Sequence, residues 1–477
     1  MKTRPSNAPL KRIRTAFAAI CSLSLAACVN LAPDYFRPQM PVAQQLAPSP
    51  AQATTALSAL PNLRAEAFFT DPRLIPLLDM ALQNNRDLRV AALNIEVAQA
   101  QLEVRQADLL PTVNLGLNGS RLTTAAGTIS STYTTGLSVA AYEVDLFQRL
   151  RNLSETARAQ YLATEEARKT VHISLLASVA LTYLAWQSDT ALLDLAQKTM
   201  ITREATVKLV QLRFDKGVSA LLEVRSAQSL LESARIANAQ LRRQKQQDEN
   251  ALTLLVGQTI PGLLLNERSV QDGGFKPVVF DELPEGLSSE MLLSRPDVAQ
   301  AELLLQASNA NIGAARAAFF PKISLTGSLG LASNDLSNLF KNGLNAWSFA
   351  PQLLQPIFDS GRNERNLQIA QANRSIAQAQ YEKTIQSAFR EVSDALIARA
   401  TLKDQWAAQK AQTQAEQDRA QLSQLRYTQG ASSYLDALDA ERALFASQQA
   451  LIQIQTQYAQ NLVTLYRGLG GGWSVLK

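Results

Sequence analysis

Two stretches of the chain place an apolar residue at nearly every second position. They cover residues 112–118 and 322–331, and polar or small residues fill the positions between. A period of two is typical of a β-strand with one apolar face and one polar face. A partner strand is expected after each polar loop. The pattern therefore predicts two β-hairpins, at about 112–147 and 322–358.

The longest segments without glycine or proline run from about 149 to 214 and from about 363 to 429. Segments of this kind predict helices of unusual length, because some sixty residues at the rise of an α-helix span roughly 90–100 Å. Apolar positions such as Ile369 and Ile376 repeat every seven residues, which favours coiled-coil packing between helices.

Each long helix is expected to reverse at a glycine, Gly217 or Gly430. Glycine readily takes the positive φ that ends a helix, and serine is a preferred cap of the helix that follows. Ser219 and Ser432 are expected to be these caps, with the returning helices ending near residues 256 and 467. Each half of the chain thus contains one helical hairpin and one β-hairpin.

The chain repeats itself at a spacing of 210 to 213 residues. Pro111 and the strand after it match Pro321 and its strand, Phe147 matches Phe358, and Gly217 matches Gly430. A spacing that holds at separate places indicates an internal duplication. The predicted divisions are a first repeat over 71–269, a second repeat over 270–467 and a C-terminal tail over 468–477.

The N-terminus reads as a targeting signal. Residues 1–14 are basic, an apolar run follows, and the run ends in small residues before Cys28. This order is typical of a secretory signal, and its end resembles the bacterial lipobox, in which Cys28 would carry a diacylglycerol and a fatty acid. The alternative is an ordinary signal cleaved nearby. We expect a signal peptide over 1–27 and an extended, proline-rich anchor segment over 28–70.

The amino-acid composition argues against nucleic-acid binding and against metal or catalytic sites. The whole chain has 46 basic and 41 acidic residues, but loss of residues 1–27 removes five basic residues and leaves 41 of each sign. A neutral mature chain gives no electrostatic reason to expect a nucleic acid partner. One histidine and two cysteines cannot form the common zinc or iron–sulfur sites. No metal site, catalytic residue or other cofactor is expected.

Four strands are too few to close a barrel alone, since small barrels need about eight. The hairpins could belong to a soluble sandwich. A membrane barrel is favoured by aromatic residues near the strand ends, namely Phe147, Phe319, Phe320, Trp347, Phe349 and Phe358. If the hairpins form a membrane barrel, several chains must build it. Three chains would supply twelve strands.

Several segments of the sequence resemble the outer-membrane channel lipoproteins of tripartite efflux pumps, the OprM/NodT family of the TolC superfamily. The most specific stretch runs from Leu293 through Arg295, Pro296 and Asp297 to Val298. Further matching segments are Phe69–Leu74, Asp145–Phe147 and the glycine-rich ending before Trp473. The resemblance covers nearly the whole mature chain.

The resemblance implies a mainly α-helical fold with a small membrane β-barrel. Three chains would close a twelve-stranded barrel in the outer membrane, and their helical hairpins would form an α-barrel tunnel in the periplasm. It further implies outer-membrane lipid, a periplasmic membrane-fusion adaptor protein and an inner-membrane efflux pump as partners. The chain would be an exit duct for drugs or other toxic small molecules, and not an enzyme. The alternatives are a duct for protein secretion and a lipid-anchored coiled-coil protein without a pore.

In this family the channel closes at the periplasmic ends of the helices. The positions that match are Tyr427, Leu435, Asp439 and Arg442, and Asp436 lies beside them; we call these five the gate residues. Three-fold symmetry would turn Leu435 and Asp439 into an apolar ring beside an acidic ring. The alternative is that Asp439 and Arg442, three residues apart, form an ordinary surface pair.

Four residues beside the two turns are candidates for docking of the adaptor. They are Arg213, Gly217, Arg426 and Gly430. The alternative is that the glycines only form the turns and the arginines are solvated. That alternative is at least as strong for the glycines, which are expected to end the helices.

Overall fold

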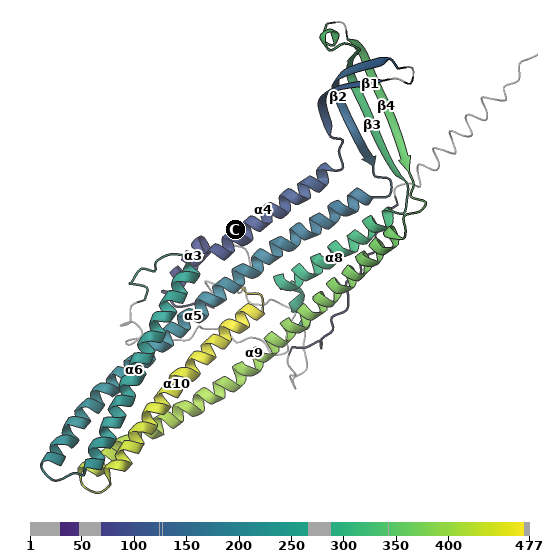
Figure 1. The fold of residues 1–477 in the computed structure, drawn as a ribbon. Coiled ribbons are helices and arrows are strands. Elements are labelled where there is room, and N and C mark those ends of the chain that lie inside the picture. The colour runs from purple at the N-terminus through teal and green to yellow at the C-terminus, as the bar shows by residue number, and fades with distance from the viewer. Residues whose placement is uncertain are drawn as a thin grey trace, which may run out of the picture. The chain divides into compact units, whose positions relative to one another are not determined.

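A computed structural model describes residues 29–46, 68–123, 125, 127–265, 288–341 and 343–471. The signal peptide predicted over 1–27, the lipidation site predicted at Cys28 and Trp473 lie outside these residues. The helices of the described chain are α3 (Leu74–Asn84), α4 (Arg86–Ala107), α5 (Arg149–Asp215), α6 (Leu221–Val256), α8 (Pro296–Ala317), α9 (Arg362–Thr428) and α10 (Tyr434–Gly468). The strands are β1 (Val113–Thr123), β2 (Ile129–Val144), β3 (Lys322–Ser333) and β4 (Leu344–Leu354). Figure 1 labels these helices and strands. Two short 3₁₀ helices cover Ser289–Ser294 and Leu336–Asn338.

The predicted elements are confirmed closely. Both hairpins form where the alternation placed them, and α5 and α9 are each 67 residues long without a break. By length and composition α5 is the one described helix that could cross a membrane, but 61% of its most apolar window is buried within the protein. We therefore assign that window to the core.

The described chain forms two compact units, and each takes segments from both sequence repeats. The first takes its described residues from 1–39, 94–165 and 300–382, and the second takes its described residues from 40–93, 166–299 and 383–477. The compact units therefore do not coincide with the predicted repeats, because each repeat contributes to both units.

The first unit contains a four-stranded antiparallel sheet in the order β1-β2-β3-β4, seen side by side in Figure 1. Two glycines face each other where the hairpins join, since Gly136 of β2 pairs with Gly330 of β3. A Cβ on Gly330 would lie 2.0 Å from the carbonyl oxygen of Thr135. The join between the two hairpins therefore requires glycine.

The extended segment that follows position 28 packs along α8 in the same unit. Arg316 donates to the carbonyl of Leu31 over 3.0 Å, and Asn309 donates to the carbonyl of Pro33 over 2.6 Å. The Arg37 guanidinium pairs with Glu302 at 2.8 Å. The first two bonds satisfy backbone carbonyls that have no strand or helix partner. Together with the ion pair they hold this extended segment on α8 without secondary structure.

The core of the second unit is rich in aromatic residues. Trp186, Tyr183 and Tyr466 are almost completely buried. The Tyr466 ring stacks on Phe68 with centroids 4.3 Å apart. The Trp186 indole donates to Glu249 of α6 over 3.1 Å, so that its polar edge is satisfied inside the core.

A buried arginine joins three elements of the second unit. Arg295 precedes α8, and its side chain is 8% exposed. It donates to Asp297 over 2.8 and 3.0 Å, to Glu391 of α9 over 3.1 Å and to the carbonyl of Gly468 in α10. Burial disfavours its charge, but Asp297 and Glu391 more than offset this and raise the pKa of Arg295.

Candidate gate at the helical turns

Glycine ends the first helix of each helical hairpin, as predicted. Gly217 and Gly430 both have φ near +74°, and a Cβ on either would meet no atom within 4 Å. The positive φ, and not crowding, is therefore what requires glycine. The backbone N–H groups of Val218 and Ala431 return to the carbonyls of Arg213 and Arg426, which closes the helix ends.

The helix caps differ from those predicted. Ala220 occupies the cap position of α6 and supplies no side-chain cap, while the Ser219 hydroxyl donates to Glu223. Ser433, not Ser432, caps α10. The Ser433 hydroxyl accepts from the N–H of Asp436, and the Asp436 carboxylate accepts from the N–H of Ser433. Asp436, predicted as a gate residue, thus has a structural role in a capping box.

The two helical hairpins meet beside their turns in an apolar cluster. Its buried members are Val210, Val224, Ala227, Tyr427, Tyr434, Ala437 and Leu438. Within it the Tyr427 and Tyr434 rings lie 5.1 Å apart, and the Arg213 guanidinium lies 4.9 Å from the Tyr427 ring centroid. Burial raises the pKa of Tyr427. Tyr427 is only 8% exposed, so this gate residue packs inside the protomer.

The other gate residues lie on one accessible stripe of α10. Leu435, Asp439 and Arg442 are exposed and follow each other at spacings of four and three residues, which places them on one helix face. The Asp439 carboxylate pairs with Arg419 of α9 at 2.5 Å. The alternative pairing with Arg442 is therefore replaced by a contact across the hairpin.

Sequence reasoning missed Arg419, although the sequence holds a signal for it. In an antiparallel helical hairpin, residues equally distant from the turn face each other. Arg419 and Asp439 are each ten residues from position 429, at the turn. In the first hairpin Asp189 of α5 lies beside Asp248 of α6, and the midpoint of these two positions also falls in the turn, between Val218 and Ser219. Burial and then the charge of Asp248 raise the pKa of Asp189 to about 7.

Of the docking candidates, three remain open to solvent. Gly217, Arg426 and Gly430 are exposed, whereas Arg213 is half-buried against Tyr427. Large apolar side chains flank the first turn, with Val218, Leu221 and Leu222 all more than half exposed. The turn region therefore offers an apolar surface beside the exposed charges of Lys216 and Arg426, although these apolar side chains did not figure among the sequence candidates.

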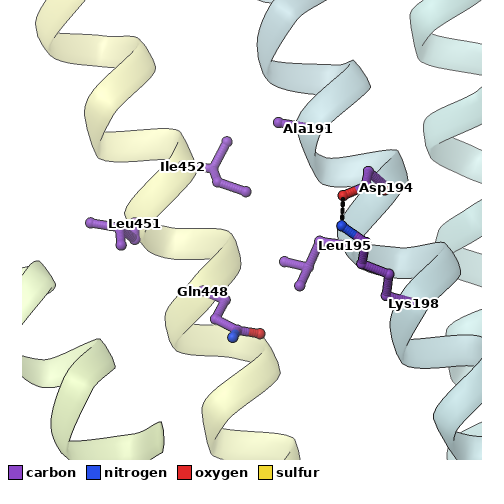
Figure 2. A pocket seen from close by; sticks show the side chains of 7 residues that line it. All are labelled: Ala191, Asp194, Leu195, Lys198, Gln448, Leu451 and Ile452. Carbon is purple, nitrogen blue, oxygen red and sulfur yellow. Dashed lines mark hydrogen bonds and ion pairs between the residues drawn. The ribbon is translucent and has the colours of Figure 1, made fainter. Parts of the chain in front are cut away.

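A groove of about 310 Å³ lies between α5 and α10, farther from the turns. Figure 2 shows its lining, to which α5 contributes Ala191, Asp194, Leu195 and Lys198 and α10 contributes Gln448, Leu451 and Ile452. Its two charged groups are paired with each other, since Lys198 contacts Asp194 at 2.6 Å. Among the residues that the structure describes, no three His, Cys, Asp or Glu side chains come together as metal ligands.

Comparison with known proteins places this geometry in a family. The profile of the outer membrane efflux protein family matches residues 77–258 and 287–471. The solvent efflux pump outer membrane protein SrpC of Pseudomonas putida is 43% identical, over 95% of this chain and 97% of its own. The cation efflux system protein CusC of Escherichia coli is 41% identical, over 95% of this chain and 97% of its own.

Solved structures of outer membrane channels are also similar to this chain. The open state of the Neisseria gonorrhoeae MtrE outer membrane channel is similar with a TM-score of 0.81 and 38% identity, over 93% of this chain and 98% of that one. The predicted fold class, with a small sheet and long helices built from an internal repeat, is confirmed by this similarity. The chain belongs to the outer membrane efflux protein family and is an outer-membrane channel of an efflux system.

Proposed function

We propose that three copies of the chain form one exit duct, which passes toxic small molecules from a periplasmic adaptor protein and an inner-membrane pump to the outside. The observation that carries the proposal is the open sheet. β1 and β4 are edge strands of the four-stranded sheet. Unpaired strand edges do not occur in the hydrocarbon of a bilayer. Each edge therefore needs a strand from another copy, and three copies give twelve strands.

The internal repeat identifies the contact that would close the ring. Within one chain, Phe147 of the first repeat stacks on Phe320 of the second, with ring centroids 4.6 Å apart. The repeat matches Phe147 with Phe358 and Phe320 with Leu110. Phe358 is 88% exposed and Leu110 is 69% exposed. The equivalent contact is thus unmade within one chain, and Phe358 of one copy would pack on Leu110 of the next.

Paired cysteines test this arrangement. Leu110→Cys with Phe358→Cys should give covalent dimers and trimers on a denaturing gel after oxidation or treatment with a short bismaleimide. The matched control, Phe147→Cys with Phe320→Cys, should cross-link within the chain and leave the mass of a monomer. Cross-linked monomers from both pairs would refute the trimer.

We also propose that Leu435, Asp439 and Arg442 line the closed periplasmic end of the duct. Support comes from their exposure on one face of α10. Asp439→Ala should raise single-channel conductance in planar bilayers and admit vancomycin, which is too large to cross an intact outer membrane. Glu416→Gln is the control, because Glu416 also pairs with Arg419 at 3.0 Å but lies on α9. Equal effects of both substitutions would assign Asp439 to the surface pair.

Cys28 is proposed to carry a diacylglycerol and a fatty acid that fix the chain to the outer membrane. The bonds from Arg316 and Asn309 support this, since they hold the segment just after position 28 on α8, the helix that leads into β3. Radiolabelled palmitate should enter the chain and should fail to enter Cys28→Ser. Incorporation into the variant would place the lipid elsewhere.

A further inference from the structure

We infer that Glu143 and Lys322 form a charged ring at the helix end of the proposed barrel, and that Lys322 favours the passage of anionic molecules through it. This inference rests on the proposed trimer, in which the two residues of each copy recur three times around the lumen. It concerns the strands alone and does not depend on whether the periplasmic end of the duct is open or closed.

The two faces of the sheet differ in polarity. One row of paired residues crosses all four strands and holds Leu115, Leu137, Leu329 and Trp347. The next row, on the opposite face, holds Asn114, Ser138, Ser328 and Ser348. In a membrane barrel the face toward lipid is apolar and the face toward a water-filled lumen is polar. We therefore call the first the lipid face and the second the lumen face.

The four strands contain three charged residues, namely Arg121, Glu143 and Lys322. Residues an even number of positions apart in a regular strand share one face. By this rule Arg121 lies on the lipid face and Lys322 lies on the lumen face. Glu143 is six positions beyond Leu137 and would join the lipid face if β2 were regular. A charge on that face is costly inside the membrane.

One extra residue in β2 moves Glu143 to the other face. Val139 pairs with Gly327 and Tyr142 pairs with Leu325, so β2 advances three residues where β3 advances two. Such a bulge reverses the facing of every side chain after it. Glu143 therefore reaches the lumen face, at the end of β2 that leads into α5.

The bulge contains a strained residue that a specific contact supports. Ala141 has a φ of +53°, in the left-handed region that alanine rarely adopts. Its N–H donates to the Thr326 hydroxyl of β3 over 3.1 Å. Beyond the bulge, Glu143 pairs with Ser324, which lies two positions from Thr326 on the lumen face. The strain thus accompanies a change in where one carboxylate lies.

Two cations contact the Glu143 carboxylate. Arg149 donates to both of its oxygens, over 2.8 and 2.7 Å. Lys322 Nζ lies 2.8 Å from the second oxygen. The Glu143 side chain is 12% exposed, whereas that of Lys322 is 53% exposed. The bidentate arginine neutralises the carboxylate, and Lys322 presents the surplus positive charge to the lumen.

The neighbouring charges are balanced locally. Arg105 and Asp108 pair with each other at 3.4 Å. Asp145 accepts from two N–H groups in the first turn of α5, over 3.1 and 2.9 Å, where the helix end is partly positive. A hollow of about 300 Å³ is lined by Glu143 and Arg149 together with the Arg105–Asp108 pair. Water and dissolved ions can therefore approach the cluster, and three copies give a ring of three lysine charges.

A cysteine probe reports the charge of the lumen directly. Gln352 of β4 pairs with Ser324, so it lies on the lumen face and is a diagonal neighbour of Lys322, about 7–8 Å away. Gln352→Cys trimers in lipid vesicles are treated with an anionic methanethiosulfonate, which carries a sulfonate, and with a cationic one, which carries a trimethylammonium. The protein without an introduced cysteine gives the background. Leu353→Cys, on the lipid face, should react with neither reagent.

Three substitutions beside the probe test the sign of the effect. Lys322→Gln should slow the anionic reagent and speed the cationic one by about twofold each at about 0.01 M salt, so the ratio of their rates falls about fourfold. Glu143→Gln should raise this ratio, because it leaves Arg149 and Lys322 unopposed. Arg121→Gln is the matched control. It also removes a positive charge from a strand, but from the lipid face, and should leave the ratio unchanged.

The opposite shifts separate an electrostatic role from a merely structural one. An unchanged ratio in Lys322→Gln, or shifts of the same sign in Lys322→Gln and Glu143→Gln, would overturn the inference. Equal reactivity of Leu353→Cys and Gln352→Cys would overturn it too, by refuting the assignment of the faces. If Glu143→Gln fails to assemble, Lys322→Gln decides, because more than half of that side chain is exposed.

The same preparations separate this inference from the proposed trimer. Cross-linking through Leu110→Cys and Phe358→Cys is scored in parallel, in chains without the probe. Absence of cross-linked trimers would overturn the proposed function. Cross-linked trimers together with an unchanged ratio in Lys322→Gln would overturn the inference alone.

Discussion

Replacement of Arg295 by methionine should weaken the second unit measurably. Methionine fills similar space but removes a charge that the structure surrounds with Asp297, Glu391 and the carbonyl of Gly468. Removing one partner of a buried ion pair costs about 3–5 kcal/mol. The carboxylate side chains are about a quarter to a third exposed, so water can compensate in part, and the lower end, about 3 kcal/mol, applies.

The expected shift in melting temperature follows from the size of the chain. Unfolding entropy is about 2.1 cal/mol/K per residue, or roughly 1 kcal/mol/K for a chain of this length. A loss of about 3 kcal/mol then lowers the midpoint by about 3 °C. The measurement is differential scanning calorimetry of the detergent-solubilised protein, with helix loss followed by circular dichroism.

Arg467→Met is the matched control. Arg467 contacts the same Glu391 at 2.5 Å, but its side chain is 39% exposed, and exposed pairs contribute little. Its midpoint should fall by less than about 1 °C. Equal shifts for the two variants, or an unchanged midpoint for Arg295→Met, would refute the assignment of Arg295 as the buried junction.

Two further predictions concern the sheet and pH. Gly330→Ala should block assembly in the outer membrane, because its Cβ would collide with the backbone of β2; Gly116→Ala, whose Cβ would have only ordinary contact at 3.6 Å, should assemble normally. Asp189, with its pKa raised to about 7 beside Asp248, binds its proton more tightly in the folded chain. Its stabilising effect is therefore complete below about pH 4 and is lost as pH rises through about 7. The melting temperature of Asp189→Asn should thus differ less between about pH 5 and about pH 8 than that of the wild type; an unchanged difference would contradict the raised pKa of Asp189.

The sequence predicted the helices and strands of this chain well for a physical reason. Strand alternation and long runs free of glycine and proline are local properties, and Gly217 and Gly430 mark the reversals directly. The pairing within each hairpin also followed, because a short connection closes it, whereas the pairing of β2 with β3 joins the two repeats and was not predicted.

Contacts between helices were harder to predict. The cap positions Ala220 and Ser433 each lie three residues beyond the turn glycine, so both predicted caps, Ser219 and Ser432, were one residue too early. Pairing of Asp439 with Arg419 depends on the register of the hairpin, which the position of the turn does encode. Contact of Arg203 with Phe445 joins residues 242 positions apart, and no local pattern reports such a separation.

The two edges of the sheet differ, and this has a genetic consequence. A subunit whose β4 edge is damaged still presents an intact β1 edge, so it can join one neighbour and leave the ring open. In the proposed trimer each β1 edge pairs with the β4 edge of the next subunit, so the barrel closes only if both edges of every subunit are intact. When damaged and normal chains are made in equal amounts, only about one eighth of random trimers contain three normal chains. Edge mutations should therefore be dominant, and a plasmid-borne copy should sensitise a wild-type cell to toxic compounds.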